Sequence, residues 1–467
     1  MSPLPTPRGQ QPKVVFLAAT GHNVVLGTAG TGKSTMAMLR ALHLARPTTT
    51  NNGPVLVVTF NNTLVTHLKY LVSETNAQVT VESYHLFARG YLNWLGLMSY
   101  GSIVPDSDRV EALVRTAIAS VKSAVGEHAL FGQPVSWFVD EIHWISGMGV
   151  ASEDEYQERP RLGRRTPLAG GAPRSIAWAV HDEYRRVRAD AGFTYDWDDL
   201  GGALAKALQS DDRPRRYRHI IIDEGQDLWP TDIRSLVHAV QPGGSLTFFG
   251  DYHQSIYGQG LSWRWTGIQL GNRPVEKFRD NYRNTAQIAR VAIAMAASDF
   301  MKADDDDLVE PRQPAADGPM PTMVKCQSAD VEIKMVRNFA RAASEDQKVA
   351  ILARTWSQAS SAVGQLPHIE LRKDMATWDD EPGLYVGTYH SAKGLEFDAV
   401  FLPFLTDDSI PHYFVLQDYP EDEAYSREAR LLYVSITRAR SSLVMSYTGR
   451  LTPLLPPNDN LWLEETR

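Results

Sequence analysis

The chain has 467 residues, 43% of them apolar and 22% charged, which is typical of a globular protein with two or three domains and excludes a largely disordered one. Its formal net charge of −8 argues against a protein that coats nucleic acid through bulk positive charge, so any nucleic acid is expected to lie in a local groove. The single cysteine, Cys326, excludes an internal disulfide, and no grouping of histidine and cysteine has the spacing of zinc ligands.

The start of the chain is rich in proline over residues 1–11 and does not have a charged stretch followed by an apolar one. The apolar runs elsewhere are far shorter than the about 20 residues that a membrane span needs. We therefore expect a cytoplasmic protein without a membrane segment.

The first apolar run leads into a glycine-rich loop. Residues 24–26 predict a buried strand, residues 35–45 predict a helix, and a complete G-x-x-x-x-G-K-S sequence lies between them. The glycines allow successive backbone N–H groups to turn inward and bind phosphate oxygens. A chance glycine-rich turn is the alternative, but the lysine, the hydroxyl and the flanking elements are all in place. The loop residues expected at a nucleotide are Gly27, Thr28, Ala29, Gly30, Thr31, Gly32, Lys33, Ser34 and Thr35.

The residue types of this loop predict its ligands. Lys33 is expected to reach the terminal phosphates, and the hydroxyl of Ser34 is expected to bind Mg²⁺, an ion that shares most of its coordination with phosphate and water. Mg²⁺ is the only metal that the sequence suggests. Ahead of the loop, Gln10 and Gln11 offer amides that could read an adenine edge.

Two further strands are predicted at residues 54–59 and 78–82, so residues 1–89 are interpreted as part of an α/β core. Phe60 and Asn62 follow the first of these strands, while Ser83 and His85 follow the second. Ligands gather at the carboxyl ends of parallel strands, which makes these side chains candidates for binding. Taken alone, Phe60 could be a core aromatic and His85 a surface histidine.

Residues 90–214 have helical periodicity and no chemical motif, which predicts an inserted helical subdomain. The acidic and aromatic residues 195–200 could suggest a metal site, but a helix N-cap with acidic first-turn residues is favoured. Arginine clusters in this region are weak evidence for binding, because such clusters are more often solvated faces. Their members are Arg159, Arg161, Arg164, Arg165 and Arg174 in one stretch, and Arg213, Arg215, Arg216 and Arg218 in another.

The core resumes over residues 215–273 with an apolar strand, residues 220–222, that delivers Asp223 and Glu224 at its end. Two carboxylates beside a phosphate loop are what nucleotide hydrolysis needs. Asp223 is expected to bind Mg²⁺, and Glu224 is expected to orient and deprotonate the attacking water.

The next strand, residues 246–249, is followed by Gln254, which is placed to sense a γ-phosphate from the edge of the sheet. Trp263 and Trp265 come shortly afterwards. Indoles in this position can stack on nucleic-acid bases, at about 1–3 kcal/mol per base, and packing in the core is an equally good explanation of either one.

Together these motifs resemble the UvrD/PcrA/Rep-like branch of the superfamily-1 helicases. They occur in the order of that family over residues 10–440. The motifs that carry the resemblance are Asp223-Glu224-x-Gln226-Asp227, Gly250-Asp251-x-x-Gln254-x-Ile256-Tyr257, Asn281-Tyr282-Arg283, Thr388-x-His390-x-x-Lys393-Gly394-Leu395-Glu396-Phe397 and Leu431-Leu432-Tyr433-Val434-Ser435-Ile436-Thr437-Arg438-Ala439.

The resemblance implies two RecA-like α/β domains, the second over residues 274–450, with ATP in the cleft between them. It implies that Tyr282 stacks on adenine, that Glu396 approaches the ribose, and that Arg283 and Arg438 act as arginine fingers on the γ-phosphate. An arginine finger can contribute about 10³–10⁵ in rate. Because these arginines belong to the second domain, hydrolysis would depend on closure of the cleft.

The resemblance also implies a path for single-stranded DNA across both domains. Stacking combined with a few phosphate contacts gives a grip that tolerates any sequence. Relatives move 3′ to 5′ along the strand. The residues expected on this path are Phe60, Asn62, Ser83, His85, Tyr257, Trp263 and Trp265 in the first domain, and Arg354, Thr388 and His390 in the second.

The second domain departs from the pattern of longer relatives. They carry a large helical subdomain ahead of the Thr388 motif, and residues 366–383 leave no room for it. Processive unwinding is therefore in question, while ATP hydrolysis and strand movement are not. An acidic segment within residues 302–321 is interpreted as an exposed loop, with metal binding as a minor alternative. Residues 443–447 are expected to close the sheet, and residues 451–467 to form a short tail without a nuclease signature.

The leading hypothesis is an ATP- and Mg²⁺-dependent DNA helicase or single-strand translocase that acts on single-stranded or tailed duplex DNA. A second hypothesis is a nucleotide-driven switch in a larger assembly, with a nuclease or another protein as its partner. A third is a family member that acts on RNA, since stacking and phosphate contacts do not distinguish the sugar.

Overall fold

The computed structural model describes residues 4, 6–28, 30–72, 78–162, 164, 168–251, 263–278, 280, 281, 283–301, 316–372, 375, 377, 378 and 381–467, without the side chains of residues 263 and 264. Several predicted positions lie outside the described residues. They are Ala29, Gln254, Tyr257, Tyr282, the side chain of Trp263 and most of the acidic segment.

The first core contains six parallel strands in the order β3-β2-β4-β5-β1-β6. Every residue of β2 is buried, as expected for a strand inside a parallel sheet that has helices on both faces. In the register, Val58 lies beside Ile222, and Ile222 lies beside Phe248, so the ends of β2, β4 and β5 meet at one edge. The bounds are β1 Gly21–Gly27, β2 Val55–Thr59, β3 Val79–Ser83, β4 Tyr217–Ile222, β5 Val240–Gly250 and β6 Glu276–Phe278.

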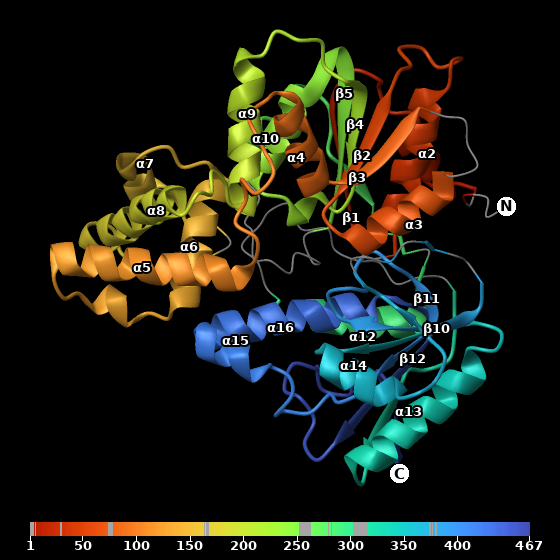
Figure 1. Ribbon diagram of the computed structural model, residues 1–467. Coiled ribbons are helices and arrows are strands. Elements are labelled where there is room, and N and C mark those ends of the chain that lie inside the picture. Colours follow the sequence, from red (N-terminus) through yellow and green to blue (C-terminus); the bar gives the residue numbers. More distant parts are fainter. Residues whose placement is uncertain are drawn as a thin grey trace.

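Helices cover both faces of this sheet (Figure 1). Met36 and Leu64 belong to the cluster on one face, while Tyr84, Leu204 and Leu236 belong to the cluster on the other. The helices of this core are α1 Gln11–Val15, α2 Lys33–Ala45, α3 Asn62–Val72, α4 Tyr84–Trp94, α9 Leu200–Ser210, α10 Pro230–Ala239 and α11 Trp263–Thr266, with the 3₁₀ turn η3 Gly225–Asp227.

The insertion forms a helical lobe at one side of the first core (Figure 1). Its own apolar cluster runs from Val104 to Tyr184 and includes the buried Trp137 and Trp144. Local caps fix the helix starts: the side chains of Asp106 and Ser152 accept hydrogen bonds from backbone N–H groups of the helices that they precede. The elements are α5 Ser107–Val125, η1 Ala129–Gly132, α6 Val135–Met148, α7 Glu153–Glu158, α8 Ala172–Asp190 and η2 Trp197–Asp199.

The second core contains seven parallel strands in the order β13-β7-β12-β11-β8-β10-β9. Its strands are β7 Thr322–Cys326, β8 Lys348–Ala353, β9 Ile369–Glu370, β10 Gly383–Thr388, β11 Phe397–Leu402, β12 Ala439–Thr448 and β13 Leu463–Thr466. Its helices are α12 Ala286–Ala296, α13 Ala329–Ala343, α14 Trp356–Val363, α15 Tyr413–Asp418 and α16 Glu421–Ile436. Two parallel-sheet cores, as expected from the sequence, are thus present.

The structure corrects several expected boundaries. The first sheet extends beyond residue 273, because β6 pairs with β1. α4 and α9, at the two ends of the predicted insertion, pack in the first core. β12 lies inside the second sheet and does not close it, while residues 451–467 are no tail: β13 pairs with β7, and Trp462 is buried. Periodicity could not predict β13, because Glu464, Glu465 and Thr466 are all exposed charged or polar residues at the edge of the sheet and show no alternation with apolar ones.

Across the described part of the chain, none of the helices combines the length and the apolar character that crossing a bilayer requires.

Candidate functional site

The glycine-rich loop connects β1 to α2 at the edge of the first sheet that faces the second core. Gly30 and Gly32 adopt left-handed backbone conformations, each with φ of 81°. A Cβ at residue 30 would lie 2.0 Å from Oδ1 of Asn281, and one at residue 32 would lie 2.7 Å from Nε2 of Gln11. Side chains are therefore excluded from this cradle, as a loop that wraps phosphate requires.

Lys33 is buried within this loop. Its Nζ donates to the carbonyl oxygens of Gly27 at 2.8 Å and of Thr28 at 2.9 Å, and it lies 3.3 Å from a carboxylate oxygen of Asp251. Gln11 is buried as well, and its amide donates to the carbonyl of Thr31 at 2.9 Å. Both predicted side chains thus converge on the loop.

Asp223 follows β4 and is fully buried, and neither of its carboxylate oxygens has a hydrogen-bond partner among the described residues. Ser34 approaches it closely enough to lower its pKa, but burial and the charge of Glu224 outweigh this and raise the pKa to about 7. A buried carboxylate without partners is costly unless a cation compensates it. The pair Ser34 and Asp223 therefore fits the oxygen ligands of Mg²⁺.

Glu224 lies next to Asp223 in a left-handed backbone conformation, with φ of 53°. Burial acts to raise its pKa, but Lys33, Lys393 and Arg438 outweigh this and hold the pKa below its ordinary value. Gln226 donates to Glu224 at 2.5 Å and accepts a hydrogen bond from the backbone of Asp251 at 2.8 Å. Glu224 is thus an ionised carboxylate in a fixed position, as a general base must be.

The two predicted arginines reach this site from the second core. Arg438 is fully buried, and its guanidinium donates to the carbonyls of Val434 and Leu395. Burial and Arg283 lower its pKa to about 10, while the negative charges of Glu224, Glu396 and Asp251 act in the opposite direction. Arg283 pairs with Glu396 at 2.5 Å. Arg438 therefore lies beside the first-core carboxylates Glu224 and Asp251, and Arg283 lies close to Arg438 and pairs with a carboxylate of its own core.

Further contacts join the two cores around this site. The buried Lys393, from the loop after β10, forms an ion pair with the buried Asp227. Asn61 donates to the carbonyl of Lys393 at 2.8 Å, and a Cβ at residue 394 would lie 2.6 Å from Leu64. The motif residues from the two halves of the chain therefore meet where the two cores contact each other.

The residues predicted to contact a strand in the first core lie at the ends of β2 and β3. The rings of Phe60 and His85 are 5.3 Å apart, and His85 lies 5.4 Å from Trp197 of η2, in edge-to-face arrangements. Ser83 is buried, and Asn62 is exposed at the start of α3. Trp197 was missed from the sequence because it comes from the far end of the insertion.

The residues of the second core that are predicted to contact a strand, Arg354, Thr388 and His390, are buried or already have partners within the protein. Arg354 makes a two-pronged ion pair with the buried Glu428, at 2.7–2.9 Å. Thr388 is buried in a turn closed by Ser391. Burial, together with Arg354 and Lys393, lowers the pKa of His390 to about 4, so its imidazole is neutral at pH 7. These residues are therefore close together.

Trp265 packs on the other side of the first core. It contacts the apolar cluster of the insertion, and the guanidinium of Arg159 lies 4.3 Å from its ring. Its carbonyl accepts hydrogen bonds from Arg234. These contacts agree with the packing interpretation of Trp265, and its stacking on bases stays a prediction.

The comparisons with known proteins agree with the geometry. Residues 8–270 match the UvrD/REP helicase N-terminal domain, and residues 366–450 match the UvrD-like helicase C-terminal domain. The first match alone spans more than half of the chain. This protein belongs to the UvrD/REP helicase family. The family and its two RecA-like cores, both expected from the motifs, are confirmed.

Two named relatives cover most of this UvrD/REP family member, and a third matches a shorter part of it. The ATP-dependent DNA helicase UvrD2 of Mycobacterium tuberculosis is 25% identical over 95% of this chain and 79% of its own length. A probable DNA helicase of Mycoplasma pneumoniae is 23% identical over 93% of this chain and 82% of its own. The ATP-dependent DNA helicase PcrA of Staphylococcus aureus is 34% identical over 20% of this chain and 13% of its own.

The acidic turn at residues 196–199 of this UvrD/REP family member is a helix cap, as favoured from the sequence. Asp196 and Asp199 form a reciprocal capping box. His143 lies 3.5 Å from Asp196 and 3.3 Å from Asp198, and their charges raise its pKa to about 10 against the effect of burial. The imidazole and the two carboxylates thus form an ion-pair cluster beside the cap.

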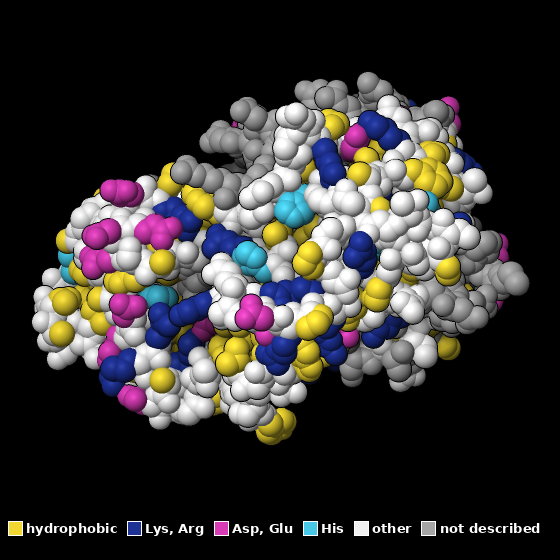
Figure 2. Space-filling model, turned by 90° about the horizontal axis from the view of Figure 1, so that it is seen from above, with side chains coloured by type: hydrophobic (Ala, Val, Ile, Leu, Met, Phe, Trp, Pro, Cys, Tyr) yellow, Lys and Arg dark blue, Asp and Glu magenta, His cyan; other side chains and the backbone are white. Residues whose placement is uncertain are grey.

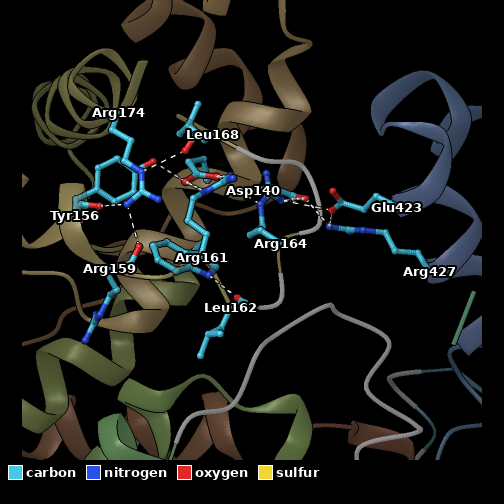
Figure 3. Close-up of polar contacts among 12 residues, drawn as sticks. Asp140, Tyr156, Arg159, Arg161, Leu162, Arg164, Leu168, Arg174, Glu423 and Arg427 are labelled. Atoms are coloured by element: carbon cyan, nitrogen blue, oxygen red, sulfur yellow. Dashed lines mark hydrogen bonds and ion pairs between the residues drawn. The ribbon is translucent and has the colours of Figure 1, made fainter. Parts of the chain in front are cut away.

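The arginine stretch of the insertion is not the solvated face that its sequence favours (Figure 3). Arg161 and Arg164 are almost completely buried, and they pair with Glu141 and Asp140 of α6. Asp140 also lies 2.8 Å from Arg427 of α16. An ionic cluster thus joins the insertion to the helix that ends beside Arg438.

Replacing Asp223 with asparagine is expected to stabilise the protein in the absence of nucleotide. Because its pKa is about 7 when folded and 3.8 ordinarily, the carboxyl favours the folded state below about pH 4 and loses that contribution as the pH rises through 7. Asp223→Asn should therefore raise the melting temperature most above about pH 7, by about 2–4 °C for each kcal/mol recovered.

Asp227→Asn is the matched control for this experiment, measured by thermal melting at about pH 5 and pH 8. It removes a buried carboxylate from the same turn but also breaks the buried ion pair with Lys393, so it should lower the melting temperature. A lower melting temperature of Asp223→Asn at pH 8 would contradict the assignment of Asp223 as an uncompensated charge.

Proposed function

We propose that this UvrD/REP family member is an ATP- and Mg²⁺-dependent translocase and helicase that acts on single-stranded or tailed duplex DNA in the cytoplasm. The observation that supports this most is the position of Glu224, a buried base held among Lys33 of the first core and Lys393 and Arg438 of the second. Hydrolysis at such a site depends on how the two cores are placed relative to each other. This dependence can couple ATP turnover to movement of one core against the other.

The roles of the residues follow from their positions. Lys33 and the loop N–H groups bind the phosphates of ATP, and Ser34 and Asp223 hold Mg²⁺, which would neutralise phosphate charge. Glu224 takes the proton from the attacking water, and Arg283 and Arg438 stabilise the charge that develops on the transferred group. Gln11 contacts adenine, and Glu396 contacts the ribose. For Tyr282 and Gln254, which lie outside the described residues, the roles come from the resemblance of their motifs alone: Tyr282 stacks on adenine, and Gln254 senses the γ-phosphate.

The DNA strand is proposed to cross the ends of β2 and β3 and to continue onto the second core near His390, moving 3′ to 5′. The ring contacts among Phe60, His85 and Trp197 offer edges and faces for bases, and such stacking tolerates any sequence. Opening or closing of the nucleotide cleft would then change the distance between two gripping surfaces.

ATP hydrolysis by the intact chain is expected to rise at least about tenfold on addition of single-stranded DNA, since the strand favours the arrangement in which both cores contact it. Phosphate release, measured with and without a thymidine oligonucleotide, checks this. A hydrolysis rate that no DNA or RNA oligonucleotide changes would contradict the proposal. Matched DNA and RNA strands would identify the preferred sugar.

A second candidate function is a strand-stimulated ATPase switch that opens little duplex itself. The compact second core favours it, because only β9 stands between α14 and β10 among the described residues. A strand-displacement assay on a 3′-tailed duplex distinguishes the two functions. Stimulated hydrolysis without displacement would assign the switch.

A further inference from the structure

A positively charged surface covers the edge of the first sheet where its strands begin. The strand ends that carry Asp223 and Asp251 face the second core, so this edge lies on the opposite side, at the top of Figure 1. Figure 2 looks onto it: lysine and arginine side chains gather across its middle, while acidic ones lie mainly over the insertion. The net charge of −8 makes this local excess unexpected.

Four histidines at this edge report the same positive field. Burial lowers the pKa of each one, and arginines lower it further: Arg273 acts on His22, and Arg40 and Arg46 act on His43. The same holds for His219 beside Arg40 and Arg218, and for His238 beside Arg234 and Arg215.

Some of these arginines have structural partners and others do not. Arg215 donates to the carbonyls of Leu208 and His238, where helices end, and Arg218 donates to Asn51. Arg216, by contrast, is exposed and forms no ion pair with any described residue; its guanidinium lies 5.5 Å from the ring of Trp94. Arg213 lies 4.5 Å from the same ring and pairs with Asp211 at 2.7 Å.

α4 connects this surface to the predicted strand path. The helix begins directly after Ser83, and Trp94, which is 40% exposed, is its last residue. Exposed or half-exposed side chains recur at intervals of four, with His85 and Arg89 in one row and Leu86 and Trp94 in a second. The helix therefore carries a continuous stripe about 14 Å long from His85 to Trp94.

Gly90 lies in this stripe, between Leu86 and Trp94. A Cβ added there would meet nothing within 4 Å, so packing does not require a glycine at this position. A glycine inside a helix costs about 0.5–1 kcal/mol relative to alanine. Its effect here is to leave the surface beside Arg89 flat and open, which suits close approach of a backbone.

We propose that the stripe on α4 is an extension of the strand path, along which the phosphates of single-stranded DNA contact Arg89, Arg213 and Arg216 beside Trp94. This inference rests on the proposed function and adds a site to it. Charge complementarity and continuity with His85 favour a nucleic-acid strand over an acidic protein segment. Trp94 holds the two guanidiniums, which donate to phosphate oxygens.

The test compares thymidine oligonucleotides of about 8 and about 16 nucleotides, since the shorter one covers only the path across the two cores. The wild-type protein should bind the longer strand more tightly. The double variant Arg89→Ala/Arg216→Ala should bind the shorter strand normally and the longer one about tenfold more weakly. Its salt dependence on the longer strand should fall by about 1.4 in logarithmic slope, the value for two phosphates of a single strand.

Lys334→Ala/Arg341→Ala is the matched control. It removes the same charge from the exposed face of α13 in the second core, and it should bind both oligonucleotides like the wild type. Trp94→Ala tests the site without a change of charge and should also weaken only the longer strand. Thermal melting verifies that each variant is folded.

Equal affinity of the wild type and the double variant for the longer strand would overturn the inference. If the double variant also lost binding to polyglutamate, the surface would be assigned to an acidic protein partner. Failure of the wild type to bind either oligonucleotide would instead overturn the proposed function, so the two failures are distinguishable.

Discussion

The variant Glu224→Gln is expected to hydrolyse ATP about 10²–10⁴ times more slowly than the wild type while still binding it. The substitution removes the base but keeps the shape of the side chain, and the Glu224 oxygen that accepts from Gln226 has an amide counterpart. Lys33, Lys393 and Arg438 lose one compensating charge but keep Asp251 or Asp227 nearby. The loss should therefore appear in turnover rather than in folding.

Phosphate release with saturating single-stranded DNA measures this loss, and binding of a fluorescent ATP analogue shows whether the site still loads. Lys33→Ala provides the contrasting variant, because it removes a phosphate contact and should weaken nucleotide binding as well. The exposed Glu158 offers a control, Glu158→Gln, with unchanged rates. Strand-stimulated hydrolysis near the wild-type rate in both Glu224→Gln and Lys33→Ala would refute the catalytic assignment.

The nucleotide side of the site could be predicted because its information is local. The glycine-rich loop, Asp223 and Glu224 each follow an apolar strand, and parallel strands place their carboxyl ends at one edge. The same logic placed Phe60 and His85 together. Spacing along the chain was sufficient in these cases, since each side chain is positioned by the element that precedes it.

The contacts between distant segments could not be predicted in this way. The ion pair of Lys393 with Asp227 joins residues from different cores, and its buried charges are visible only once both cores are placed. The arginines near residue 161 look like a solvated run because their partners, Asp140 and Glu141, lie about 20 residues earlier on α6, with α7 in between. A charge pattern gives the type of partner but not its position.

α16 shows how such contacts link distant parts of the protein. At its middle, the adjacent Arg427 and Glu428 pair with Asp140 of the insertion and with Arg354 on the predicted strand path, and just after its end lies Arg438. A helix transmits displacement along its axis because its backbone is hydrogen-bonded throughout. One rigid element therefore contacts the insertion, the strand path and the nucleotide site.

The second large effect is expected from Arg283→Ala, which should slow ATP hydrolysis by about 10³–10⁵ with little change in melting temperature. The guanidinium of Arg283 pairs with Glu396. Because the Glu396 side chain is 37% exposed, water can solvate it when the ion pair is lost, so the protein should remain folded. Arg438→Ala should be as slow but also less stable, because Arg438 is fully buried and donates to the carbonyls of Val434 and Leu395.

Melting temperature and turnover, measured together, separate these roles. Arg440→Ala is the control: Arg440 is a half-exposed neighbour that pairs with Asp398, and its removal should leave turnover within about threefold. Arg283→Lys should not restore the rate, since an ammonium lacks the planar fork that contacts two oxygens at once. Equal activity of Arg283→Ala and Arg440→Ala would contradict the role of Arg283. Arg438, just after α16, would then be the arginine of the second core that stabilises the transition-state charge, together with Lys33 of the first core.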